Sequence, residues 1–243
     1  MNNEKLKINT VMESNYRFTF QANQFFAEVV PCTLSVFNQT IDDPEVARKI
    51  KTRRAVDAAI REGSPEKWYE DYRYKQFCER QAVKQGEKFK ELTPVQKLLQ
   101  WTNSQKQSQP CFIFGVQEFE GTRRKQAEIK HLSGLFMFDG DHLPFDPREL
   151  YERTQVPDFP WKVRLAHKTS SGEGGRLVCE WRLEVGNIAD CQIQLARDLG
   201  LMGVKGTTGK PVCDDSCIDA CRISYAPQRS DIYYIDENKL FNF

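Results

Sequence analysis

The chain has 243 residues, of which 40% are hydrophobic and 28% are charged, and its formal net charge is +1. This composition is ordinary for a globular protein and excludes a polycation, so any attraction to nucleic acid must come from a local basic surface. No run approaches the roughly 18 consecutive apolar residues of a membrane-spanning helix. The polar start, MNNEKLKINT, lacks the apolar run of a signal peptide. We therefore expect a cytoplasmic protein with no membrane partner.

The first half of the chain changes from strand character to helical character. Residues 16–37 are rich in aromatic and β-branched side chains, which predicts one or two strands. From residue 43 to about residue 105 we expect a helical elaboration of the domain. Asp42 or Asp43 can cap its first helix, Ser64 a second and Thr93 a third, and a proline directly follows Asp43, Ser64 and Thr93. The many Lys and Arg side chains of this region predict either solvated helix faces or a surface that faces phosphate groups.

Strand character returns in the second half. We expect strands within residues 111–119, 133–143, 161–168 and 176–185, and short strands around RISYAP and IYYI near the C-terminus. Asn187 can cap a helix that Gly200 ends. This order of elements predicts one α+β domain over residues 1–243, with a mainly antiparallel central sheet.

Two carboxylates close the most apolar run of the chain, which reads LFMFDGD and ends at Asp139 and Asp141. Side chains two positions apart on a strand point the same way, so these two can converge on one hard cation such as Mg²⁺ or Mn²⁺. Ions held in this way serve phosphoryl and nucleotidyl transfer. Asp-Gly-Asp is also a good turn sequence, and that alternative stays open.

Two further polar segments follow the acid pair. Residues 169–176 read TSSGEGGR, where small residues let backbone amides approach a phosphate and Arg176 can neutralise it. A flexible hairpin loop is the alternative. Residues 214–222 read DDSCIDACR, which places acids ahead of a strand candidate and ends at Arg222. This segment predicts a third metal ligand and a phosphate-binding arginine, or else an Asp-capped turn.

The three segments HLSGLFMFDGDHL, TSSGEGGRLV and DDSCIDACRISYAP resemble, in this order, the N-terminal domain of VirE-type (virulence-associated protein E) proteins. These are distant relatives of the archaeo-eukaryotic primase and PrimPol superfamily. The resemblance begins at about Val30 and implies a primase-polymerase-like core of the RRM-like type. It implies that Asp139, Asp141 and Asp215 hold the metal, with Asp219 as a competing alignment for the third position.

The same resemblance implies nucleotide-binding roles for Ser171, Gly172, Arg176 and Arg222, all directed to the phosphates. Where polymerising members of the superfamily have Ser-x-His, this chain ends the loop in Gly-Gly-Arg. That departure favours a catalytically inactive nucleic-acid-binding module of the same fold. The intact Asp-Gly-Asp favours a nucleotidyltransferase of the primase or polymerase type, and a metal-dependent nuclease is a third hypothesis. The implied partners are a nucleoside triphosphate, DNA or RNA, and a helicase-type module of a mobile element whose replication the protein would prime.

Overall fold

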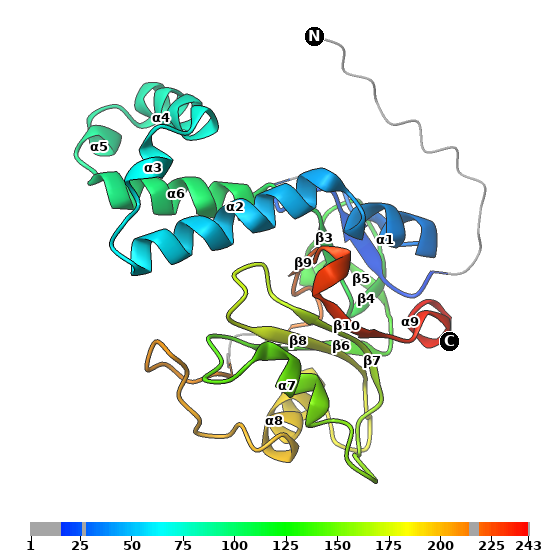
Figure 1. The fold of residues 1–243 in the computed structure, drawn as a ribbon. Helices are drawn as coiled ribbons and strands as arrows, with labels where there is room; N and C mark the ends of the chain where they lie inside the picture. Colours follow the sequence, from blue (N-terminus) through cyan, green and yellow to red (C-terminus); the bar gives the residue numbers. More distant parts are fainter. Residues whose placement is uncertain (1–15, 26–27, 214–218, 243) are drawn as a thin grey trace.

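The computed structural model describes residues 16–25, 28–213 and 219–242, and the fold is α+β with antiparallel strand pairing (Figure 1). The first half contains β1 (Thr19–Gln21), β2 (Val30–Pro31), α1 (Leu34–Ile41), α2 (Pro44–Arg61), α3 (Glu66–Tyr69), α4 (Tyr72–Gln85), α5 (Glu87–Lys90) and α6 (Pro94–Gln107). The second half contains β3 (Cys111–Ile113), β4 (Val116–Phe119), β5 (Ile129–Leu132), β6 (Leu135–Gly140), α7 (Pro147–Glu152), β7 (Val163–Lys168), β8 (Gly175–Glu180), α8 (Ile188–Asp198), β9 (Ser224–Tyr225), β10 (Ile232–Ile235) and α9 (Glu237–Phe241).

The strands form two four-stranded sheets and one hairpin. The first sheet has the order β2-β1-β3-β9, the second has the order β10-β7-β8-β6, and β4 pairs with β5. In the second sheet β6 pairs with β8 along its whole length, from Leu135 opposite Glu180 to Gly140 opposite Gly175. Figure 1 shows α7 and α8 on the side of this sheet that lies away from α2.

Strand β6 is apolar from Leu135 to Phe138 because these residues lie between two cores. Phe136 and Phe138 pack into a cluster that includes residues of α7 and α8. Leu135 and Met137 face the opposite way, into a cluster with side chains of β1, β3, α1 and α2. Since side chains alternate along a strand, Asp139 lies on the same face as Leu135 and Met137. Asp139 therefore points toward the side of the sheet that carries the helices α1 and α2.

The predicted helical elaboration exists as α2 to α6, which we call the helical arm (Figure 1). Asp43 caps α2 through the Glu45 amide, and Thr93 caps α6 through a reciprocal capping box, so both expected caps are confirmed. The extent predicted for the second helix was wrong. Ser64 is not its cap, and the segment is split into α3 and α4, because Asp71 accepts hydrogen bonds from two amides of the next turn and starts a new helix.

Two of the expected strands also differ from the structure. Residues 34–37 are helical, because the Thr33 hydroxyl caps α1. The expected strand at 111–119 is two strands, β3 and β4, which belong to different sheets. The chain turns between them at Gly115, where a Cβ atom would lie 2.6 Å from the Ala220 carbonyl oxygen, so only glycine permits this approach. β5, α7 and α9 were not predicted.

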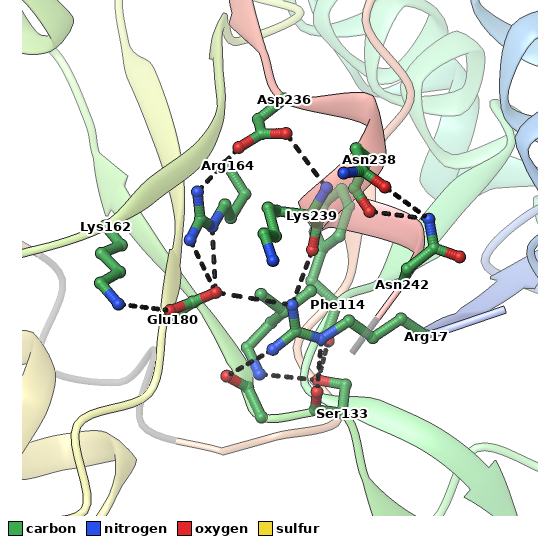
Figure 2. Close-up of polar contacts among 12 residues, drawn as sticks. Arg17, Phe114, Ser133, Lys162, Arg164, Glu180, Asp236, Asn238, Lys239 and Asn242 are labelled. Carbon is green, nitrogen blue, oxygen red and sulfur yellow. Dashed lines mark hydrogen bonds and ion pairs between the residues drawn. The ribbon is translucent and has the colours of Figure 1, made fainter. Parts of the chain in front are cut away.

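A network of charged side chains ties the start of the described chain to its end (Figure 2). The Arg17 guanidinium donates to the Lys239 carbonyl at 2.7 Å and lies 3.8 Å from Glu180. Arg164 joins Glu180 to Asp236, at 2.8 Å from each carboxylate. These contacts fasten α9 against β7 and β8. Every helix in the described part of the chain is too short or too polar to cross a membrane.

Candidate functional site

A cavity of about 390 Å³ lies where the helical arm meets both four-stranded sheets. It is lined by side chains from α2, α6, the end of β6, the β7–β8 loop, β8, β9 and two turns: Arg53, Lys106, Arg124, Asp139, Asp141, His142, Thr169, Ser170, Ser171, Arg176, Asp219, Arg222, Ile223 and Tyr225. Five of these side chains are cationic and three are acidic, which gives the lining a formal charge of +2 when His142 is neutral. The cavity therefore attracts anions while it presents carboxylates to a cation.

Three polar residues form a row across the second sheet, and two of them, Asp139 and Arg176, line the floor of this cavity. Strand register places Asp139 of β6 opposite Arg176 of β8, and Arg176 opposite His167 of β7. Arg176 donates from Nε to Asp139 Oδ1 at 3.1 Å and from Nη2 to Oδ2 at 2.8 Å. The two side chains are 9% and 1% exposed, so this is a buried, two-pronged ion pair.

The row continues to the first sheet through a hydroxyl. Arg176 Nη1 donates to Ser224 Oγ at 3.2 Å, and Ser224 Oγ lies 3.3 Å from His167 Nε2. His167 Nδ1 lies 2.9 Å from the Lys168 carbonyl oxygen, which can only accept, so we place the imidazole proton on Nδ1 and let Nε2 accept from Ser224. Burial, reinforced by the charge of Arg176, lowers the pKa of His167 to about 4. The imidazole is therefore neutral near pH 7.

Asp141 differs from its neighbour in the acid pair. Its amide donates to the Val212 carbonyl at 2.9 Å, which fixes the backbone just beyond β6. Its carboxylate makes no hydrogen bond or ion pair with a residue that the structure describes, whereas Asp139 is paired on both oxygens. Burial, and next the negative charge of Asp139, raise the pKa of Asp141. A cationic ligand beside Asp141 would stabilise the charged form of its carboxylate.

The Gly-rich segment is the loop of the β7–β8 hairpin. The Gly172 amide donates to the Thr169 carbonyl at 2.9 Å, so this amide is engaged within the loop. Gly172 has φ +84°, and a Cβ atom there would lie 3.0 Å from Arg54 Nε, so the residue lets the loop pass close to α2. The Ser171 side chain lines the cavity. The segment is thus a hairpin loop, which was one of the two interpretations of its sequence. Ser171 and Arg176 line the cavity, where a phosphate could reach them.

Two cationic side chains of the helical arm reach the cavity. Arg53 of α2 donates to Ser170 Oγ at 3.2 Å and lies 3.5 Å from the Asp57 carboxylate. Lys106 of α6 lies with its ammonium 5.1 Å from the centre of the Tyr225 ring. Burial, followed by the nearby charge of Arg53, lowers the pKa of Lys106.

The remaining basic side chains of α2 are mostly engaged in structural contacts. Arg48 pairs with Glu45 on the same helix, and Arg61 pairs with Glu173 of the β7–β8 loop. Arg54 binds the Asp231 carboxylate. Arg53 thus faces the cavity while its neighbours hold the arm in place. That this surface faces phosphate groups stays a prediction.

The third motif is only partly within the described residues. Asp215 lies outside them, so its role as a metal ligand stays a prediction. Asp219 and Arg222 both line the cavity, and the Arg222 amide donates to the Asp219 carbonyl at 3.3 Å in a turn. Arg124 holds this turn through a hydrogen bond to the Cys221 carbonyl at 3.0 Å.

The donors in the described part of the chain suit a hard cation only in part. The carboxylate oxygens of Asp139 and Asp141 have the chemistry that Mg²⁺ and Mn²⁺ prefer. Over residues 16–25, 28–213 and 219–242, no group of three or more His, Cys, Asp or Glu side chains is arranged to hold a metal ion. A third protein ligand would therefore have to come from the segment around Asp215 or from a movement of Asp219.

Sequence reasoning missed several residues of this cavity. Arg53 belonged to a region recognised as basic, but nothing in its spacing separated it from the other cations of α2. Lys106 lies in a segment with no motif, and Arg124 and Tyr225 had no role assigned to them. Only the packing of the arm and the turn against the sheets brings these three to the acid pair. His142 lines the cavity and contacts Glu173 at 2.8 Å.

Comparison of the chain with protein-family models, with curated proteins and with solved structures gave no match. The functional interpretation therefore rests on the geometry of the cavity and on the three sequence motifs.

Proposed function

We propose that this chain is a primase-polymerase-like domain that binds a nucleoside triphosphate and nucleic acid beside a carboxylate-held Mg²⁺ or Mn²⁺ ion. One observation carries the proposal: a single cavity combines the two carboxylates at the end of β6 with five cationic side chains from separate elements. Its volume of about 390 Å³ lies within the roughly 300–1,000 Å³ typical of small-molecule sites. The resemblance of the three motifs to VirE-type N-terminal domains adds the class of reaction, which is nucleotidyl transfer in priming.

The residues of this chain divide into two groups in the proposed reaction. Asp139 and Asp141 hold the cation, with Asp215 or Asp219 as a third ligand. Such an ion, when bound, neutralises charge on phosphate oxygens and lowers the pKa of an attacking hydroxyl. The cationic lining orients the triphosphate, with Arg176 contributing from the floor of the cavity.

Phosphate contacts are the main source of affinity for such a ligand. Ser171 offers a hydroxyl from the hairpin loop, and Arg222 offers a guanidinium from the turn opposite. Arg53 and Lys106 approach from the helical arm, so the packing of the arm against the sheets completes the site. A helicase-type module is the partner that a priming function implies.

A second candidate of a different class is a nucleic-acid-binding module without catalysis. Two observations favour it: both Asp139 oxygens are paired with Arg176, and the β7–β8 loop carries no histidine. In this candidate the cavity is an anion site for a nucleic-acid backbone, and binding needs no metal.

Calorimetry separates the two candidates. Mn²⁺ with ATP is titrated into the wild-type protein, into Asp139→Ala/Asp141→Ala, and into Glu87→Ala as a control. Glu87 is an exposed carboxylate on α5, at the far end of the arm (Figure 1). The proposal expects metal-dependent ATP binding that is lost in the double variant and kept in the control. Binding of single-stranded DNA in the presence of EDTA, with no ATP binding in any of the proteins, would favour the non-catalytic module instead.

A further inference from the structure

A metal ion in this cavity would need the Asp139 carboxylate, but the Arg176 guanidinium already binds it. Both Asp139 oxygens accept hydrogen bonds from Arg176, at 3.1 and 2.8 Å. A divalent ion bound to Asp139 would meet this guanidinium, because a hard cation takes its carboxylate ligands at only about 2.0–2.6 Å. The Arg176 side chain must therefore leave Asp139, at least in part, before the ion can use both carboxylates.

The ion pair between Arg176 and Asp139 is strong enough to affect the binding of a metal ion to Asp139. It is nearly inaccessible to solvent, with side chains 9% and 1% exposed, and a third donor of Arg176 reaches Ser224. A two-pronged arginine–carboxylate pair is among the stronger hydrogen-bonded contacts in proteins. Breaking such a buried pair without replacement leaves an uncompensated charge. A cation for Asp139 and an anion for Arg176, supplied together, would avoid that penalty.

The lining of the cavity can bind both a cation beside Asp139 and an anion beside Arg176. Asp141 lies one residue beyond β6 and lines the same cavity as Asp139, so an ion drawn to Asp141 lies within reach of Asp139. Arg176 lines the cavity together with Ser171 and Arg222, so phosphate oxygens bound among these residues lie beside its guanidinium. The metal ion thus replaces Arg176 as the partner of Asp139, and the phosphate replaces Asp139 as the partner of Arg176.

We propose that Arg176 closes the metal position of Asp139 in the ligand-free protein, and that a polyphosphate draws it away and thereby couples phosphate binding to metal binding. This inference rests on the proposed function, because it assumes that the cavity takes a metal ion and a nucleoside triphosphate. The coupling is reciprocal: metal held at Asp139 releases Arg176 for phosphate, and phosphate held by Arg176 releases Asp139 for metal. The ligand-free site then has low affinity for either ligand alone.

The first test measures Mn²⁺ alone, by electron paramagnetic resonance of the free ion. Arg176→Gln removes the occupant of Asp139, so we expect this variant to bind Mn²⁺ about tenfold more tightly than the wild type, within the roughly 5–150-fold range of such couplings. Arg53→Gln is the matched control. It also removes one positive charge from the cavity lining, but it leaves the pair between Asp139 and Arg176 intact, so its effect must be smaller.

The second test measures polyphosphate alone and does not depend on the fold of the first variant. Inorganic tripolyphosphate is titrated with EDTA present, so that no metal contributes. Asp139→Asn removes the charge that holds Arg176, and we expect it to raise the metal-free affinity for tripolyphosphate about tenfold. In Asp139→Asn/Arg176→Gln this gain must disappear. Far-UV circular dichroism establishes that each variant is folded.

The outcomes distinguish this inference from the function on which it rests. Equal Mn²⁺ affinity in the wild type, Arg176→Gln and Arg53→Gln would overturn the inference and leave the metal site standing. An unchanged or weaker affinity of Asp139→Asn for tripolyphosphate would overturn it as well. If no variant binds Mn²⁺ with or without ATP, both the inference and the metal-dependent function are contradicted.

Discussion

Arg54 and Asp231 join the helical arm to the body of the protein. The Arg54 guanidinium donates to both oxygens of the Asp231 carboxylate, at 2.9 and 2.8 Å, and a further bond at 2.8 Å reaches the Thr169 carbonyl. The Asp231 side chain is only 6% exposed. A single side chain of α2 thus holds both the turn before β10 and the first residue of the β7–β8 loop. The position of that loop beside the cavity depends on this contact.

We expect Arg54→Ala to destabilise the protein by about 3 kcal/mol, because it leaves the buried Asp231 carboxylate without its partner. Urea unfolding measures the free energy of unfolding of each variant. Arg54→Ala/Asp231→Ala should be more stable than the sum of the two single changes predicts, since the double variant leaves no unpaired charge. Strict additivity of the two changes would contradict the role given to this pair.

The buried, neutral state of His167 predicts a loss of stability in acid. Its pKa is lowered to about 4 in the folded protein, whereas an unfolded histidine titrates near about 6.5. As the pH falls, the unfolded chain therefore binds a proton before the folded protein does. Keeping His167 neutral costs no stability above about pH 6.5, and the free energy of unfolding decreases as the pH falls from there toward 4. The difference amounts to about 3 kcal/mol at pH 4.

The measurement is the free energy of unfolding in urea between pH 4 and pH 7.5, for the wild type and for His167→Gln. The wild type should lose more stability over this range than the variant, because glutamine does not titrate. Parallel curves for the two proteins would show that His167 is protonated without cost, and would contradict the neutral imidazole that accepts from Ser224.

Several features of the fold could be predicted from the sequence because they depend on local chemistry. The caps at Asp43, Thr93 and Asn187 follow from side chains that bond amides two or three residues away. The burial of β6 follows from its unbroken apolar run. By contrast, the splitting of residues 111–119 depends on the approach of Ala220 to Gly115, which are far apart in the chain. No local pattern contains that contact.

The candidate site was predictable in its acids but not in its pairing. Asp139 and Asp141 stand out in the sequence because they end a buried strand. The partner of Asp139 is set by the strand order β7-β8-β6, which brings Arg176 opposite it across 37 positions of sequence. From the sequence, Arg176 was expected to bind phosphate. Its pairing with Asp139 could be recognised only from the strand register in the structure. Lys106 reaches the cavity through the packing of α6, which sequence periodicity does not specify.

Gly115→Ala should disturb the site from a distance. The added Cβ would lie 2.6 Å from the Ala220 carbonyl oxygen, a backbone atom that cannot rotate away, so the turn that carries Asp219 and Arg222 must shift. We expect a destabilisation of about 1–3 kcal/mol, as for overpacked cores, with weaker binding of ATP.

Gly121→Ala is the matched control for this prediction. Its Cβ would contact only the flexible Glu128 side chain, at 3.1 Å, so we expect a small effect on the free energy of unfolding and none on ATP binding. Calorimetry and urea unfolding together make the comparison. An equal effect of the two substitutions would show that the contact between Gly115 and Ala220 does not constrain the turn.

Binding of Mn²⁺ should depend on pH through Asp141. Burial and the charge of Asp139 raise the pKa of Asp141, so protons compete with the metal at a higher pH than for an ordinary aspartate. We expect Mn²⁺ affinity, measured by calorimetry with ATP present, to fall as the pH is lowered toward that raised pKa. Asp141→Asn should bind Mn²⁺ weakly at every pH. Affinity that is constant across the acid range in the wild type would contradict Asp141 as a ligand.

The most direct test of the proposed function is primer synthesis on a single-stranded DNA template. The template is incubated with Mn²⁺ and labelled ribonucleoside or deoxyribonucleoside triphosphates, and the products are resolved on a denaturing gel for the wild type and for Asp139→Ala/Asp141→Ala. The account predicts labelled oligonucleotides from the wild type and none from the folded double variant. If the wild-type protein binds both ATP and the template yet forms no labelled product, nucleotidyl transfer is contradicted and the binding module without catalysis stands in its place.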